Sequence, residues 1–100
     1  MSDTSELPLE AEEYLTWLSA ERGRSANTLA AYRRDLRAYT AWLAKRKRRV
    51  PDATEADIVD YVHHLRSEGK APSSVARATV AVRSLHRFLA AEGLAERANP

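Results

Sequence analysis

The sequence contains no cysteine, only three glycines and four prolines, and no long apolar run. Without cysteine, the chain can form neither disulfides nor thiolate or cysteine-ligated zinc sites. A membrane-spanning helix needs roughly 20 consecutive apolar residues, and no stretch approaches that length. Residues 1–6 are polar and acidic, which is the wrong charge for a secretion or transit signal. We therefore expect a cytoplasmic protein with no membrane contact.

Strand patterning is also missing, because apolar and polar residues do not alternate over any sustained stretch. The few glycines and prolines instead separate four segments in which apolar residues recur at helical spacing. The predicted helices span about 8–21, 27–47, 54–68 and 73–92. Short connections join the first helix to the second and the third to the fourth, which predicts two antiparallel hairpins. We therefore expect an all-α, four-helix domain over residues 7–97, preceded by a disordered stretch at 1–6.

Each predicted helix has one apolar stripe that should face the core. Four tyrosines lie on these stripes, so we expect core packing for each of them. Thr54 and Asp57 have the spacing of a capping box at the start of the third helix. The stripe residues are Ala11, Tyr14, Leu15, Leu18, Leu29, Tyr32, Leu36, Tyr39, Leu43, Ile58, Tyr61, Val62, Leu65, Val75, Ala78, Val82, Leu85, Phe88 and Leu89, with Trp42 at the border.

Acidic residues are scarce in one part of the chain. Residues 22–49 carry ten basic residues and a single acidic one, Asp35, whereas residues 1–21 carry six acidic residues and no basic one. Residues 51–69 have one basic and five acidic residues, and residues 70–100 have five basic and two acidic. Positive charge is thus concentrated on the second helix and its following loop, with a contribution from the fourth helix. Such a segment favours a polyanionic partner, and we expect nucleic acid.

Candidate contacts to nucleic acid lie on these two helices. Arg33, Arg34 and Arg37 lie off the apolar stripe and can bind phosphates or guanine edges. Serine, asparagine and threonine at a helix start suit phosphate, although capping alone is the alternative role for Ser25, Asn27, Ser73 or Ser74. Residues 45–49 either touch the flanking backbone of the nucleic acid or form a solvated loop. The full set of candidates is Arg24, Ser25, Asn27, Thr28, Arg33, Arg34, Arg37, Lys70, Ser73, Ser74, Arg77, Arg83 and Arg87.

No cofactor, metal site or catalytic group is expected. His63 and His64 are adjacent, and adjacent helical side chains point about 100° apart, which disfavours a shared metal ion. The sequence shows no Ser-His-Asp grouping and no glycine-rich phosphate loop. We therefore expect two surface histidines and a chain that performs no reaction itself.

Several runs, in their order and spacing, resemble a known family. The runs are Leu18 with Glu21-Arg22-Gly23, Ser25, Asn27-Thr28-Leu29, Ala31-Tyr32-Arg33-Arg34-Asp35-Leu36, Trp42-Leu43, Thr54-Glu55-Ala56-Asp57-Ile58, Ser73-Ser74-Val75-Ala76-Arg77, Val82-Arg83-Ser84-Leu85-His86-Arg87-Phe88-Leu89, Glu92-Gly93 and Asn99-Pro100. Together they resemble the N-terminal, SAM-like core-binding domain of Xer-type tyrosine recombinases in the phage-integrase superfamily. The similarity covers about residues 7–100 and is closer to the XerD-like branch than to the XerC-like branch.

The resemblance implies half of a C-shaped clamp around duplex DNA, with the second and fourth helices facing the major groove. Residues 98–100 would begin a linker to a catalytic domain beyond Pro100. That domain would hold the nucleophilic tyrosine, so His63-His64-Leu65-Arg66 is not read as the family's catalytic His-x-x-Arg pattern. Full-length relatives cut and rejoin DNA, typically to resolve chromosome dimers at a recombination site before cell division. The implied location is the cytoplasm, in association with the nucleoid. Implied partners are duplex DNA, the catalytic domain and neighbouring recombinase protomers.

Two other functions stay open from the sequence. A helical protein-interaction module would use the acidic first helix to dock a basic partner and would show no salt-sensitive affinity for DNA. A free-standing DNA-binding regulator would bind DNA without any catalytic domain.

Overall fold

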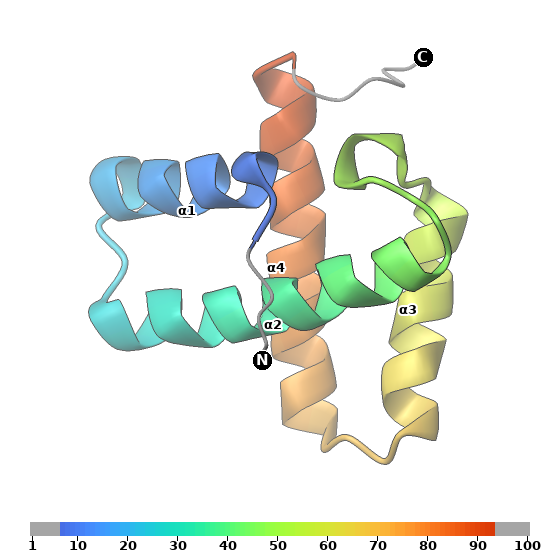
Figure 1. Ribbon diagram of the computed structural model, residues 1–100. Coiled ribbons are helices and arrows are strands. Elements are labelled where there is room, and N and C mark those ends of the chain that lie inside the picture. The colour runs from blue at the N-terminus through green and yellow to red at the C-terminus, as the bar shows by residue number, and fades with distance from the viewer. Residues whose placement is uncertain (1–6, 94–100) are drawn as a thin grey trace, which may run out of the picture.

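The computed structural model describes residues 7–93, and this range folds into four α-helices and one short 3-10 helix (Figure 1). The elements are α1 (Leu9–Arg22), α2 (Ala26–Lys45), η1 (Val50–Asp52), α3 (Glu55–Ser67) and α4 (Pro72–Ala91). Within residues 7–93 there is no strand, so the predicted all-α class is confirmed. None of the helices in this range is both long and apolar enough to cross a membrane. The expectations for residues 1–6, for the boundary at 97 and for the linker at 98–100 lie outside the described residues.

Local signals set where three of the helices begin or end. Gly23 ends α1 in the left-handed conformation, with φ of 60°, which a residue without Cβ adopts at little cost. The capping box predicted at α3 is present: the Asp57 N–H donates to Thr54 Oγ1 at 3.2 Å, and the Thr54 N–H donates to the Asp57 carboxylate at 2.8 Å. Ser25 caps α2, which resolves the choice left open between Ser25 and Asn27.

The end of α2 differs from the prediction because a motif without glycine closes it. The Arg48 N–H donates to the Leu43 carbonyl and the Lys47 N–H donates to the Ala44 carbonyl, both at 2.9 Å. This is the Schellman pattern, with Lys47 in the left-handed position at φ of 62°. The helix therefore stops at Lys45, two residues before the predicted end.

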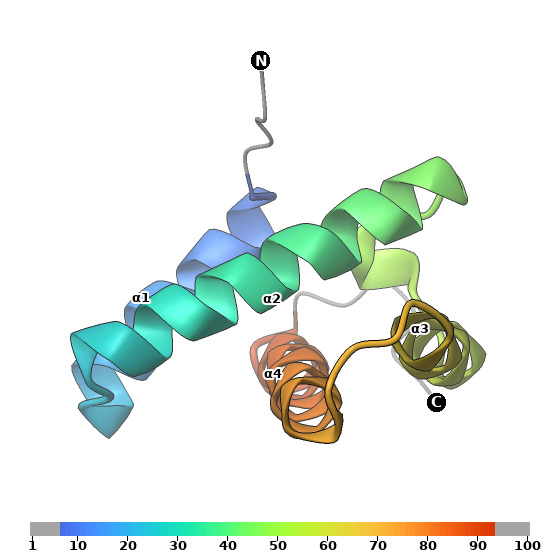
Figure 2. The same ribbon diagram turned by 90° about the horizontal axis from the view of Figure 1, so that it is seen from below.

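The four helices form two antiparallel hairpins, as predicted, and the hairpins cross. Figure 1 shows α1 and α2 side by side in one hairpin and α3 and α4 in the other. In Figure 2, α3 and α4 are seen end-on while α1 and α2 extend across the view. Because of this crossing, α2 packs more extensively against α4 than against any other helix. The two positively charged helices are thus brought into direct contact.

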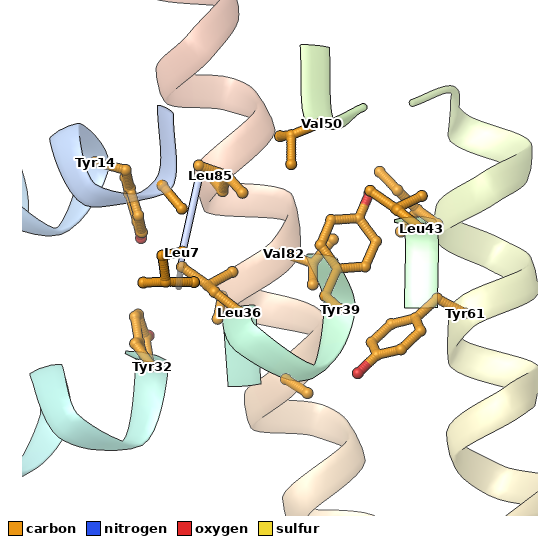
Figure 3. Close-up of a cluster of buried hydrophobic side chains, with 14 of the residues drawn as sticks. Leu7, Tyr14, Tyr32, Leu36, Tyr39, Leu43, Val50, Tyr61, Val82 and Leu85 are labelled. Carbon is orange, nitrogen blue, oxygen red and sulfur yellow. The ribbon is translucent and has the colours of Figure 1, made fainter. Parts of the chain in front are cut away.

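The core is one cluster that draws on every helix and on the 3-10 helix. Tyr14, Tyr32, Tyr39 and Tyr61 are all buried, which confirms the prediction that the tyrosines pack in the core (Figure 3). The other residues of the predicted apolar stripes are buried as well, except for four apolar side chains that lie half-buried at the edge of the core. These are Leu29, Trp42, Val62 and Phe88.

One polar contact crosses this core between α2 and α4. The Tyr39 hydroxyl and His86 Nε2 lie 2.7 Å apart, and the two rings meet edge to face. Burial lowers the pKa of His86 from its ordinary value of 6.5, while the charges of Asp57 and Glu55 act in the opposite direction. A neutral imidazole can accept a hydrogen bond from the tyrosine hydroxyl, whereas a protonated ring cannot.

The lowered pKa of His86 leads to a prediction about how the stability of the fold depends on pH. Because its pKa is lowered in the folded chain, the unfolded chain binds more protons in mildly acidic solution. The contribution of His86 to the free energy of unfolding should be complete above about pH 6.5 and should decline as the pH falls below it. Urea denaturation between about pH 7 and pH 5 should show this decline, and His86→Gln should reduce it. The exposed His63, replaced as His63→Gln, is the control and should leave the slope unchanged. An unaltered slope in His86→Gln would contradict the assignment.

Candidate nucleic-acid interface

A hollow of about 250 Å³ lies where α2 and α4 meet above the end of α3. Arg34 reaches it from α2, Lys70 from the α3–α4 turn, and Ser74 and Arg77 from the first half of α4. Arg34, Lys70 and Arg77 are exposed, and Ser74 is half-buried. Four of the thirteen predicted contact residues, which the sequence places on separate segments, therefore converge on one place.

Asp35 holds Arg77 from the wall of this hollow. Arg77 Nε and Nη2 donate to the two carboxylate oxygens of Asp35 at 2.8 and 2.9 Å. The Asp35 side chain is only 10% exposed, whereas that of Arg77 is 41% exposed. The hydrogen bonds to Asp35 raise the pKa of Arg77. The single acidic residue of the basic segment thus fixes the orientation of a guanidinium group whose remaining N–H groups are available to a ligand.

Arg33 and Arg34 are neighbours in sequence but lie on different sides of α2. Arg33 points to α1, where Nη1 and Nη2 donate to the two carboxylate oxygens of Glu12 at 2.9 and 3.1 Å. This pairing raises the pKa of Arg33. Arg34 is turned by about 100° along the helix and reaches the hollow beside α4 instead. Arg37, one turn further on, is half-buried and does not line that hollow.

At the start of α2, one polar residue caps the helix and another is exposed to solvent. The Thr28 N–H donates to Ser25 Oγ at 3.2 Å, and the Ser25 hydroxyl donates to Thr28 Oγ1 at 3.1 Å. Ser25 thus performs the capping role that was the alternative to phosphate contact. Asn27 follows in the first turn with an exposed side chain.

At the start of α4, the suggested N-cap role of Ser73 or Ser74 is wrong. Pro72 is the first helical residue and Ala71 occupies the N-cap position, so neither Ser73 nor Ser74 is the N-cap. Proline favours the first helical position because it has no N–H to satisfy there. The serines instead lie within the first turn, whose N–H groups have no partner inside the helix. Ser74 lines the hollow and Ser73 is exposed beside it.

A second hollow, of about 400 Å³, lies between α1, the beginning of α2 and the second half of α4. Arg24 and Arg87, both predicted contacts, line it together with Arg22, which the prediction omitted. Burial raises the pKa of Tyr14 in its wall, and the charges of Arg24 and Arg87 act against this shift. The sequence feature that could have identified Arg22 as a candidate contact is its position as the first basic residue of the segment at 22–49.

Arg83 lies apart from both hollows. Its Nη1 donates to Glu55 Oε1 at the start of α3 at 2.9 Å, and this contact lowers the pKa of Glu55. Arg33 and Arg83 are therefore separated from the cluster around Arg34 and Arg77, although all four are on α2 and α4.

Part of the basic segment at 45–49 holds the α2–α3 connection in place. The Arg46 guanidinium lies over the Trp42 ring at 4.4 Å and donates to Asp60 at 3.2 Å. Arg48 Nε lies 3.3 Å from the carboxylate of Asp57, which is buried. At least these two arginines therefore have a structural role.

The two adjacent histidines have different surroundings. His63 is exposed, as expected, whereas His64 is half-buried and its ring packs against Tyr61 and Trp42. Among residues 7–93 there is no group of three His, Asp or Glu side chains that could hold a metal ion.

Comparison with known proteins gives one consistent result. Residues 11–93 match the family model described as "Phage integrase, N-terminal SAM-like domain". Tyrosine recombinase XerD of Rhizobium meliloti is 43% identical over 94 residues, which cover 94% of this chain and 30% of the relative. XerD of Mycobacterium tuberculosis is 44% identical over 100 residues, which cover 90% of this chain and 32% of the relative. XerD of Halalkalibacterium halodurans is 38% identical over 87 residues, which cover 85% of this chain and 29% of the relative. The chain thus spans less than a third of these relatives. No solved structure matches it significantly.

The Asp35–Arg77 pair generates a prediction. Asp35→Asn should lower the free energy of unfolding by about 1 kcal/mol, because it removes a charged hydrogen bond between a nearly buried carboxylate and a guanidinium that is 41% exposed. It should also remove the protection of the Arg77 Nε–H from solvent exchange, which NMR can follow. Glu55→Gln is the matched control, since Glu55 is 65% exposed and its removal should cost less than about 0.5 kcal/mol. Equal decreases in stability in the two variants would contradict this interpretation.

Proposed function

This chain belongs to the phage integrase N-terminal SAM-like domain family, and on that premise we propose that it binds duplex DNA with the face shared by α2 and α4. The observation that carries the proposal is the convergence of Arg34, Lys70 and Arg77 on one hollow between these helices. Basic groups from separate segments can neutralise neighbouring phosphates on one duplex and release their counterions.

Within this face the groups have different roles. Arg34 and Lys70 are exposed, and none of the carboxylates in residues 7–93 forms an ion pair with them, so they bind phosphates. Arg77 is held by Asp35 in one orientation and presents its remaining N–H groups to a base edge. A guanidinium that is already oriented loses less side-chain freedom on binding. The free N–H groups in the first turn of α4, at Ser73 and Ser74, donate hydrogen bonds to a phosphate.

The face extends along α4 beyond this cluster. Arg77, Val80, Ser84 and Arg87 recur at spacings of three and four residues and therefore lie on one side of the helix. This side connects the smaller hollow to the larger one, where Arg24 and Arg87 lie. Arg24 and Arg87 then contact the backbone of the duplex further along. Arg33 and Arg83 stay with their carboxylates on α1 and α3 and take no direct part.

The wider activity in this proposal is inferred from the relatives, which are named tyrosine recombinases. In this proposal the chain is the non-catalytic part of a site-specific recombinase that breaks and rejoins DNA, and the reacting groups lie outside these 100 residues. Its partners are duplex DNA, a catalytic domain that completes the clamp, and neighbouring recombinase protomers. A cytoplasmic location at the nucleoid is consistent with such a substrate.

The salt dependence of DNA binding tests the proposed face. The triple variant Arg34→Gln, Lys70→Gln and Arg77→Gln should bind duplex DNA more weakly. It should also flatten the slope of log K against log salt by roughly 0.9 for each phosphate that the variant no longer neutralises. Gel-shift titrations at several salt concentrations give this slope. Far-ultraviolet circular dichroism shows whether the variant is folded.

The control variant removes the same number of positive charges from other positions. Arg33→Gln, Arg66→Gln and Arg83→Gln together should leave the slope close to that of the unaltered chain, because none of these arginines lines either hollow on the α2–α4 face. Equal weakening in both triple variants would show that net charge alone drives binding. Absence of any DNA binding at low salt would favour a helical protein-interaction module.

A further inference from the structure

The larger hollow has an apolar floor that DNA binding does not require. Tyr14, Trp17 and Phe88 form a contiguous aromatic group there, with ring centroids 5.3 to 6.2 Å apart. Val80 lies at the lip and is 52% exposed, although it is a large apolar residue on a helix that buries most of its others. A space of about 400 Å³ can receive two or three apolar side chains.

The rim of this hollow is positively charged. Arg22, Arg24 and Arg87 line it, and none of the carboxylates in residues 7–93 forms an ion pair with any of them. At least five other arginines in residues 7–93 do form such pairs, among them those at positions 33, 46, 48, 77 and 83. Among the described residues, Glu92 at the end of α4 is the one acidic side chain that lines the hollow. The site therefore combines an apolar floor with excess positive charge.

We propose that this hollow is a docking site for an acidic amphipathic helix of a partner protein. Leucine or phenylalanine side chains of the partner enter the space above Trp17 and Phe88, and its flanking carboxylates pair with Arg22, Arg24 and Arg87. This is the helix-in-groove mode of recognition, in which apolar anchors supply affinity and rim charges supply specificity. The proposal goes beyond DNA binding and does not depend on it.

The geometry favours this occupant over two others. A DNA duplex would satisfy the arginines through its phosphates but would leave the aromatic floor unfilled. A second copy of this chain could offer the acidic α1, but among residues 7–93 that helix presents Leu9 as its single exposed large apolar side chain. One leucine does not fill a space of about 400 Å³.

The two tryptophans provide a built-in readout. Trp17 lines the hollow, whereas Trp42 packs against Tyr61 and Arg46 on another part of the molecule. The ¹⁵N-labelled chain is titrated with a synthetic helical peptide of about 16 residues, with leucine and phenylalanine on one stripe and glutamate beside it. The Trp17 indole signal should shift and saturate while that of Trp42 stays in place. The same peptide with glutamine in place of glutamate should bind about tenfold more weakly or worse.

Two matched variants locate the site. Val80→Glu places a carboxylate at the lip and should weaken peptide binding by about tenfold or more, whereas Val59→Glu alters a valine of comparable exposure on α3 and should have no effect. Both positions are exposed, at 52% and 40%, so neither variant should unfold the chain. Arg24→Gln with Arg87→Gln should weaken binding similarly, and Lys45→Gln with Arg66→Gln should not.

Four results would overturn the proposal. The first is no shift of Trp17 at saturating peptide, and the second is equal weakening by Val80→Glu and Val59→Glu. The third is a Trp17 shift that appears with rising protein concentration alone, which would identify a second copy as the occupant. The fourth is a Trp17 shift on adding duplex DNA but not on adding peptide, which would show that the hollow serves DNA binding alone.

Discussion

The crossing of α2 and α4 is the contact on which both the core and the proposed DNA-binding face depend. Leu36 and Tyr39 of α2 and Leu85 of α4 are fully buried, and Val82 nearly so. Tyr39 also reaches His86 of α4 by a hydrogen bond. On the solvent side of the same crossing, Asp35 binds Arg77. Any change in how these helices cross would therefore alter both the packing and the spacing of the basic groups.

The structure divides the arginines by what they contact. Arg33, Arg46, Arg48 and Arg83 pair with carboxylates of other elements, and these pairs connect α1 to α2, the α2–α3 loop to α3, and α4 to α3. Arg77 forms a similar pair, but it does so at the edge of a hollow. The positive charge that faces solvent on the α2–α4 side is consequently smaller and more localised than the count over residues 22–49 suggests.

Periodicity was sufficient to predict the fold class, the four helices and their buried stripes. Apolar spacing and the Thr54–Asp57 capping box depend on residues close in sequence, so they can be read locally. The end of α2 was placed two residues late because Lys47, and not glycine, takes the left-handed position there. At α4, proline at the first helical position set the start at Pro72 and left Ala71 as the N-cap.

The site was harder to predict because ion-pair partners come from distant segments. Arg33 and Arg34 look equivalent in sequence, yet Glu12, which is 21 residues away, pairs with Arg33. Asp35 and Arg77 are separated by 42 residues, and only the crossing of the hairpins brings them together. The sequence therefore identified which helices carry the positive charge, but not which arginines remain available or that Arg22 belongs to the second hollow.

Backbone amide mapping during a titration with duplex DNA tests the central claim most directly. If the α2–α4 face binds the duplex, the largest chemical-shift changes should fall on residues 24–38, which include the first part of α2, and on residues 70–80, which include the first part of α4. These changes should diminish as salt is added. The amides of α3 at residues 55–63 should change little. Changes centred on α1 or on the outer side of α3, with the α2–α4 face unaffected, would contradict the account.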